Sequence, residues 1–184
     1  MTAPILIVYA HPYPKRSHAN RALLDAVRDL EGVELRSLYT LYPDFDIDVA
    51  AEQAALEKAR VVVWQHPLYW YTAPGMLKHW FDKVLTRGWA YGDGGTALAG
   101  KICQWVTSTG GDDASYQPGG LHEHVFQAFV PVVAQTARFC GMTWQEPLVV
   151  HGAHKIDDHT LKAHAERYRA RLIDLAKRDA PEAA

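Results

Sequence analysis

The sequence predicts an α/β fold in which helices cover both faces of a parallel five-stranded sheet. Three observations predict it. Short apolar runs recur along the chain, and the run Val61–Trp64 is continuous, as in a central strand that is buried on both faces. Segments with apolar residues at helical spacing separate these runs. No repeat or linker interrupts the alternation, so we expect one domain over residues 1–184.

The first half of the chain begins with a strand at Ile5–Ala10. A helix follows, which Ser17 is expected to cap and Gly32 to end. A second strand is expected at Val33–Leu38 and a second helix at Val49–Lys58.

The third strand runs into a loop over Gln65–Ala73, and Pro74 suits the first turn of the next helix. In that helix, Trp80 and Phe81 are expected to be core residues. The second half is expected to supply, in order, a glycine-rich excursion over the sheet edge or the site (Gly88–Gly100), a strand (Ile102–Thr107), a helix kinked at Pro131 (Leu121–Cys140), a strand (Thr143–Val150) and a final helix (Thr160–Lys177). Five strands suit the order 2-1-3-4-5 better than a six-stranded dinucleotide fold.

Composition excludes several classes of protein. The net charge of -2 and the pI of about 6.5 argue against a nucleic-acid or lipid-surface protein. No apolar run approaches the roughly 18 residues of a membrane span. The N-terminus lacks a charged leader, and Cys103 and Cys140 fit no disulfide framework, so we expect buried thiols in a cytoplasmic protein.

The loop after the first strand is a predicted phosphate site. It leads into a helix N-terminus, where free N–H groups attract an anion. Ser17 and Asn20 can donate hydrogen bonds, and Arg16 or Lys15 can add positive charge. The alternative is a plain capping serine with solvated basic neighbours, because Ser is common at helix caps.

Two further loops end at the same edge of the sheet. Tyr69, Trp70 and Tyr71 are consecutive, so they cannot all face one core, and their loop favours a flat ligand. In Thr107–Gly111, two glycines let backbone approach a ligand closely. Together, a phosphate cradle, an aromatic slot and a glycine strip indicate a flavin mononucleotide (FMN) site.

Beyond the third loop stand Tyr116 and His122, a pair that can stabilise negative charge or pass a proton. In isolation, a Tyr and a His in a polar loop are more often surface residues. Ten histidines also raise the question of a metal, but the pairs His122/His124 and His151/His154 lack a zinc spacing, so no metal is expected.

Four segments together resemble the flavodoxin-like NAD(P)H:quinone oxidoreductases: YAHPYPKRSHAN, WQHPLYWYTAPGMLKHWFDKVLTRGWAYGDGGTALAGK, TSTGG and LRSLYTLYPDFDIDVAAEQAAL. The resemblance covers about residues 5–141 and is closest to the ancillary oxidoreductase subunits of glutathione-gated potassium efflux (Kef) systems. It implies a flavodoxin-like three-layer sandwich that binds FMN and forms a homodimer.

The resemblance also implies roles for particular residues. Tyr116 and His122 would stabilise charge on the reduced flavin. Tyr42, Phe45 and Gly88–Gly95 are candidates for contact with the dimer partner, and a plain surface loop is the equal alternative. The residues expected to bind the cofactor are His11, Ser17, His18, Ala19, Asn20, Pro67, Leu68, Tyr69, Trp70, Tyr71, Ser108, Thr109, Gly110 and Gly111.

The implied reaction is the two-electron reduction of quinones by NAD(P)H, with ping-pong hydride transfer. The sequence leaves NADH and NADPH open as donors, and azo or nitro compounds open as oxidants. A second hypothesis is a regulatory flavin-binding subunit of a membrane antiporter in which turnover is incidental. This hypothesis leaves open a peripheral position at the inner membrane, through that protein partner.

Overall fold

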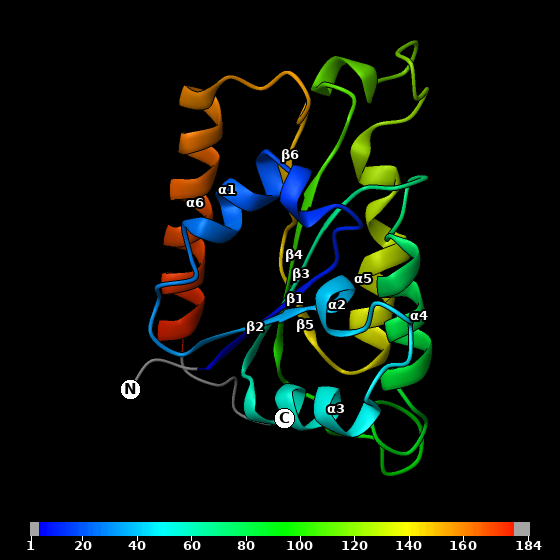
Figure 1. Cartoon of the computed structure of the whole chain (residues 1–184). Helices are drawn as coiled ribbons and strands as arrows, with labels where there is room; N and C mark the ends of the chain where they lie inside the picture. Colours follow the sequence, from blue (N-terminus) through cyan, green and yellow to red (C-terminus); the bar gives the residue numbers. More distant parts are fainter. Residues whose placement is uncertain (1–3, 179–184) are drawn as a thin grey trace.

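A parallel sheet lies between two layers of helices in the computed structural model, which describes residues 4–178 (Figure 1). The order β2-β1-β3-β4-β5 confirms the predicted 2-1-3-4-5 arrangement, and a sixth strand, β6, also pairs with β4. The strands are β1 (Ile5–Tyr9), β2 (Val33–Ser37), β3 (Val61–Pro67), β4 (Ile102–Ser108), β5 (Thr143–Trp144) and β6 (Leu148–Val150).

The fifth predicted strand is divided in two, which corrects the five-strand expectation. β5 pairs with the start of β4, and β6 pairs with its end. Between them lies Pro147, which has no N–H to donate to the ladder. The chain therefore leaves the sheet at residues 145–147 and returns in the same direction.

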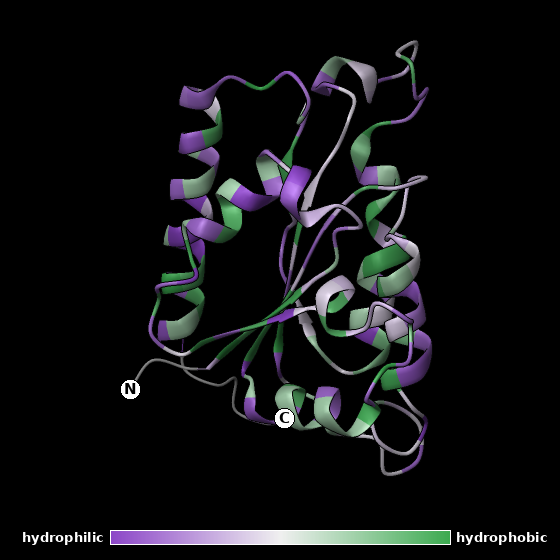
Figure 2. Ribbon diagram, viewed as in Figure 1, coloured by the Kyte–Doolittle hydropathy of each residue, from purple (hydrophilic) through white to green (hydrophobic). Residues whose placement is uncertain are grey.

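Helices α1 (Ala19–Asp25) and α6 (Asp158–Lys177) cover one face of the sheet. The other face is covered by α3 (Val49–Lys58), α4 (Gly75–Val84) and α5 (Val130–Phe139), with the short α2 (Leu38–Leu41) beside them (Figure 1). Because successive strand residues alternate between faces, β1 contributes to both cores. Figure 2 shows the hydrophobic strands between the two helical layers.

Two predicted helices are shorter than expected. Pro131 does not kink a long helix; it lies in the first turn of α5, where its missing N–H is not needed. The preceding residues form turns and η3 (Phe126–Ala128) instead. Likewise α1 ends at Asp25, well before Gly32, and turns fill the interval. The remaining short helices are η1 (Pro14–Arg16) and η2 (Asp113–Ser115).

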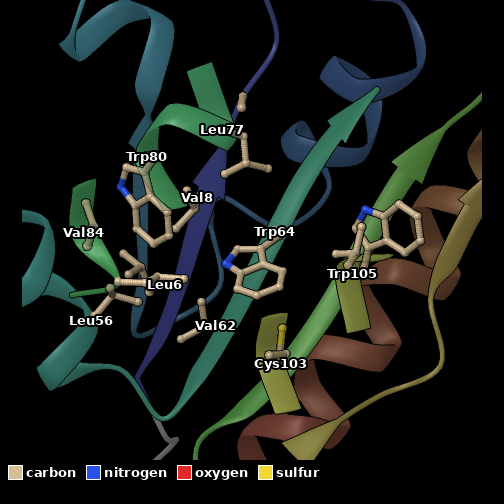
Figure 3. Close-up of a cluster of buried hydrophobic side chains, with 14 of the residues drawn as sticks. Leu6, Val8, Leu56, Val62, Trp64, Leu77, Trp80, Val84, Cys103 and Trp105 are labelled. Atoms are coloured by element: carbon tan, nitrogen blue, oxygen red, sulfur yellow. The ribbon is translucent and has the colours of Figure 1, made fainter. Parts of the chain in front are cut away.

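The core on the α3–α5 face contains three buried tryptophans, Trp64, Trp80 and Trp105 (Figure 3). Trp80 is fully buried, as predicted, and its indole N–H donates to Glu52 Oε2 over 2.8 Å. Glu52 is also fully buried and accepts from the hydroxyl of Tyr42 over 2.6 Å. Tyr42 is therefore held inside the fold, so the expectation that it contacts a dimer partner is wrong.

The glycine-rich excursion joins the end of α4 to the start of β4, so it lies at the amino ends of the strands (Figure 1). Trp89 is tied there to α3 by a 2.9 Å hydrogen bond to Glu57. Of the two expectations for this segment, the one that it covers the site is therefore wrong, because the site lies at the opposite, carboxyl ends of the strands.

Candidate functional site

A cavity of about 440 Å³ lies at the carboxyl edge of the sheet, in the size range of small-ligand sites. The loops after β1, β3, β4 and β6 converge on it. They bring together most of the predicted cofactor residues: His11, Ser17, His18, Ala19, Asn20, Pro67, Leu68, Tyr69, Ser108, Thr109 and Gly110.

Asn20 is the most constrained polar side chain of this cavity. Its Nδ2 donates to Ser108 Oγ over 2.8 Å, and its backbone N–H donates to Ser17 Oγ over 3.2 Å. Its Oδ1 is buried and accepts no hydrogen bond from the residues that the structure describes. Since a buried acceptor without a donor is costly, a water molecule or a bound ligand would stabilise this oxygen by donating a hydrogen bond to it.

A series of buried hydrogen bonds links Asn20 to Gln65 and Tyr168. Gln65 Nε2 donates to the carbonyl of Asn20 over 2.9 Å, and Gln65 Oε1 accepts from the Tyr168 hydroxyl over 3.2 Å. Gln65 and Tyr168 are fully buried. The start of α1 is thus fixed to β3 and α6, although sequence reasoning assigned neither side chain to the site.

Arg16 brings positive charge to the cavity, and His18 brings an imidazole. Arg16 lies over the ring of Tyr13, with its Cζ 6.0 Å from the ring centroid. His18 Nε2 lies 3.5 Å from Asp158. Because α1 has only seven residues, its dipole contributes less than expected, and these side chains become the main attraction for an anion. His11 also lines the cavity, and burial lowers its pKa.

The aromatic loop forms a tight turn. Tyr69 and Thr72 exchange two backbone hydrogen bonds of 3.0 Å, which leaves Trp70 and Tyr71 with φ values of 49° and 64°. Trp70 is 91% exposed, and of the three aromatics only Tyr69 lines the cavity. The amide of Leu68 bonds Ser108 O and that of Tyr69 bonds Thr72 O, so neither amide is free to bind the edge of a ring.

The two predicted catalytic residues lie together beside the glycine strip. The rings of Tyr116 and His122 are 4.3 Å apart, and His122 Nδ1 lies 3.3 Å from the Tyr71 hydroxyl. A Cβ on Gly111 would lie only 2.8 Å from His122 Nε2, so a larger residue here would displace the His122 ring. Burial raises the pKa of Tyr116. Neither residue lines the 440 Å³ cavity, and their catalytic roles stay predictions.

Sequence reasoning missed the segment after β6. Ala153 and His154 line the cavity, and a Cβ on Gly110 would be 3.4 Å from the His154 ring. His154 was weighed only as a metal ligand. The signal that points to it is topological, since β6 ends at the same edge as β4.

Two further properties of residues 4–178 bear on other functions. No group of three or more His, Cys, Asp and Glu side chains is arranged to hold a metal ion there. Within the same range, every helix is too short or too polar to cross a membrane.

A second cavity, of about 490 Å³, lies between α4 and α5. It is lined by apolar side chains such as Phe81, Val132 and Phe139, the last two being 59% and 63% exposed. None of the predicted cofactor residues lines it. It is therefore a separate surface feature, and its exposed apolar wall is typical of an interaction surface.

Comparisons with known proteins agree with this geometry. Residues 3–172 match the family model Flavodoxin_2, described as a flavodoxin-like fold. The chain is 55% identical over 174 residues to the glutathione-regulated potassium-efflux system ancillary protein KefF of Klebsiella aerogenes, covering 92% of this chain and 95% of that one.

Two solved structures extend the likeness. General stress protein 14 of Treponema denticola, solved in complex with FMN, has a TM-score of 0.86 at 35% identity and covers 94% of this chain and 99% of its own. An NADPH-quinone reductase from P. pentosaceus has a TM-score of 0.82 at 26% identity, with coverages of 98% and 99%.

Proposed function

This chain belongs to the flavodoxin-like family that includes the KefF ancillary proteins, and we propose that it binds FMN and reduces quinones with electrons from NAD(P)H. One observation carries the proposal. Asn20 lines a cavity built from the predicted phosphate, aromatic and glycine loops, and its buried Oδ1 accepts no hydrogen bond within residues 4–178. A relative of the same fold was solved with FMN bound.

The residues present fit this cofactor. Ser17, Arg16 and His18 would hold its phosphate, because they supply a hydroxyl, a guanidinium and an imidazole to the cavity. Asn20 Oδ1 would accept a hydrogen bond from a hydroxyl of the ribityl chain. The amides of Gly110 and Gly111 bond no backbone or side-chain acceptor within residues 4–178, so they can donate to the polar edge of the ring.

When bound, FMN supplies the two-electron redox chemistry, and the protein supplies binding, orientation and electrostatics. Tyr69 provides an apolar wall, and the Tyr116–His122 pair provides hydrogen-bond donors beside Gly111. A donor that is already in place stabilises negative charge at little reorganisation cost. Hydride donor and oxidant would use one open face in turn, which predicts ping-pong kinetics.

We also propose a homodimer. The exposed apolar side chains Val132 and Phe139 lie on the α4–α5 cavity, and Tyr71 stacks on Phe129 nearby with ring centroids 5.0 Å apart. A second copy would cover this face and extend the aromatic wall of the site. Phe139→Glu should then produce monomers in analytical ultracentrifugation, whereas the control Lys162→Glu on α6 should not.

The likeness to KefF supports a second proposal, that the chain is an ancillary subunit of a potassium-efflux antiporter. This second proposal has two versions. In the first, the protein both reduces quinones and regulates the antiporter. In the second, FMN is structural and turnover is incidental. An assay of quinone-dependent NAD(P)H oxidation, run beside a pull-down with the antiporter, separates them. Parallel double-reciprocal plots support the enzyme. Antiporter binding without NAD(P)H oxidation favours the purely regulatory form.

A further inference from the structure

His151 follows β6 directly and faces the glycine loop, yet it does not line the cofactor cavity. Its Nδ1 lies 2.9 Å from Thr109 Oγ1, and Thr109 Oγ1 lies 2.7 Å from the carbonyl oxygen of Gly111. The imidazole also packs against Tyr116 and Phe126, with both pairs of ring centroids 5.4 Å apart. One side chain thus contacts the glycine loop and a predicted catalytic residue.

The direction of these hydrogen bonds follows from chemistry. A carbonyl oxygen only accepts, so the hydroxyl proton of Thr109 points to Gly111 O. The Thr109 oxygen must then accept from His151, which requires a proton on Nδ1. The opposite assignment would leave two oxygens 2.7 Å apart with no proton between them.

We propose that His151, in its Nδ1–H form, is a positioning residue that fixes the Thr109–Gly111 segment against the bound flavin. The proposal rests on the proposed FMN site. Burial lowers the pKa of His151, although Asp113 and Asp112 act against this, so the neutral ring prevails near pH 7. Asp113 Oδ1 lies 3.7 Å from Nε2, beyond hydrogen-bond distance, so Thr109 alone places the proton on Nδ1.

The backbone keeps this loop folded without the imidazole. Gly152 N–H donates to Gly111 O over 2.8 Å, and Ala153 N–H donates to Thr109 O over 2.9 Å. A variant at His151 should therefore fold. What it loses is the hydrogen bond from His151 to the Thr109 hydroxyl, which acts beside the bond from that hydroxyl to Gly111 O.

Two substitutions and one control test the proposal. His151→Asn places an amide N–H near the position of Nδ1–H, whereas His151→Leu keeps bulk and removes the donor. We expect the Leu variant to bind FMN about tenfold more weakly, the cost of one lost hydrogen bond, and to shift the midpoint potential of the bound flavin. The Asn variant should match wild type in both. His79→Leu on α4, a histidine bonded to Phe45 O, should change neither.

Nitrogen-15 NMR of the His151 ring in cofactor-free protein gives a readout that needs no FMN. A neutral ring protonated at Nδ1 supports the proposal. A ring protonated at Nε2 overturns it, as do Asn and Leu variants that bind FMN equally well or equally badly. Wild-type protein that fails to bind FMN would contradict the proposed function instead, and the tautomer would still decide the role of His151.

Discussion

The side-chain amide of Asn20 donates a 2.8 Å hydrogen bond to the hydroxyl of Ser108, which joins the helix after β1 to the end of β4. The two residues are 88 positions apart in the sequence. Asn20 lies in the first turn of α1, and Ser108 is the last residue of β4. Both residues line the 440 Å³ cavity. Their contact also leaves Asn20 Oδ1 as the unpaired acceptor on which the proposed ligand site depends.

Replacing Asn20 with Ala should weaken FMN binding by a factor of about ten or more, because hydrogen bonds of about 1 kcal/mol each are lost. Fluorescence quenching of FMN measures this dissociation constant. Gln53→Ala is a matched control, since its amide bonds the carbonyl of Val84 away from the cavity. If the Asn20 variant and the wild type bind FMN with equal affinity, Asn20 does not contribute to FMN binding.

Glu52 is a buried carboxylate that binds three partners, Arg36, Tyr42 and Trp80. Replacing it with Ala leaves the Arg36 charge without its partner and should lower the free energy of unfolding by about 3–5 kcal/mol. Urea denaturation measures the loss. Glu57→Ala removes an exposed carboxylate that bonds Trp89 and should cost less than about 1 kcal/mol. Similar losses in both variants would contradict this account.

His66 is fully buried and accepts a 2.8 Å hydrogen bond from the Trp105 indole, so its Nδ1 carries the proton and donates to Pro67 O. Burial lowers its pKa from 6.5 to about 4. At pH values between about 4 and 6.5, the imidazole of His66 is protonated in the unfolded chain and neutral in the folded chain. The free energy of unfolding should therefore decrease as pH falls through this window, by about 3 kcal/mol from this residue.

Urea denaturation at pH 7.5 and pH 4.5, in wild type and His66→Gln, isolates the effect. The variant has no imidazole at this position, so the gap in stability between wild type and variant should narrow at the lower pH. A constant gap would show that His66 titrates normally.

The turn at Trp70 stores backbone strain, since a left-handed φ of 49° is unfavourable for a residue with a large side chain. Trp70→Gly should relieve it and raise the free energy of unfolding by up to about 1 kcal/mol, because the exposed indole packs on little. The same change at Gln53, in α3, should destabilise instead. A less stable Trp70 variant would mean that its side chain makes a contact in solution.

The sequence was sufficient for the sheet order and for most of the cavity. Apolar runs identify buried strands, and parallel strands bring the loops that follow them to one edge, so residues as distant as Ser17 and Ser108 could be grouped in advance. The direction in which each side chain of a loop points could not be predicted from the sequence. Tyr69, Trp70 and Tyr71 were predicted as a set, but a two-residue left-handed turn sends Trp70 into solvent.

Two prolines show why the start of α5 and the division of the last strand could not be predicted from the sequence. Pro131 starts α5 and Pro147 interrupts a strand, yet each equally suits a kink or a loop when only neighbouring residues are known. The roles of His151 and His154 were also beyond prediction from neighbouring residues. Their partners, Thr109 and Gly110, lie on another strand's loop, so only the assembled sheet reveals the pairing.

The most direct measurement is the visible spectrum of the purified protein after incubation with excess FMN and gel filtration. The account predicts one flavin per chain, with absorption bands that bleach on anaerobic addition of NAD(P)H and return when a quinone is added. Protein that stays colourless after this treatment would contradict the central claim that the cavity around Asn20 binds FMN.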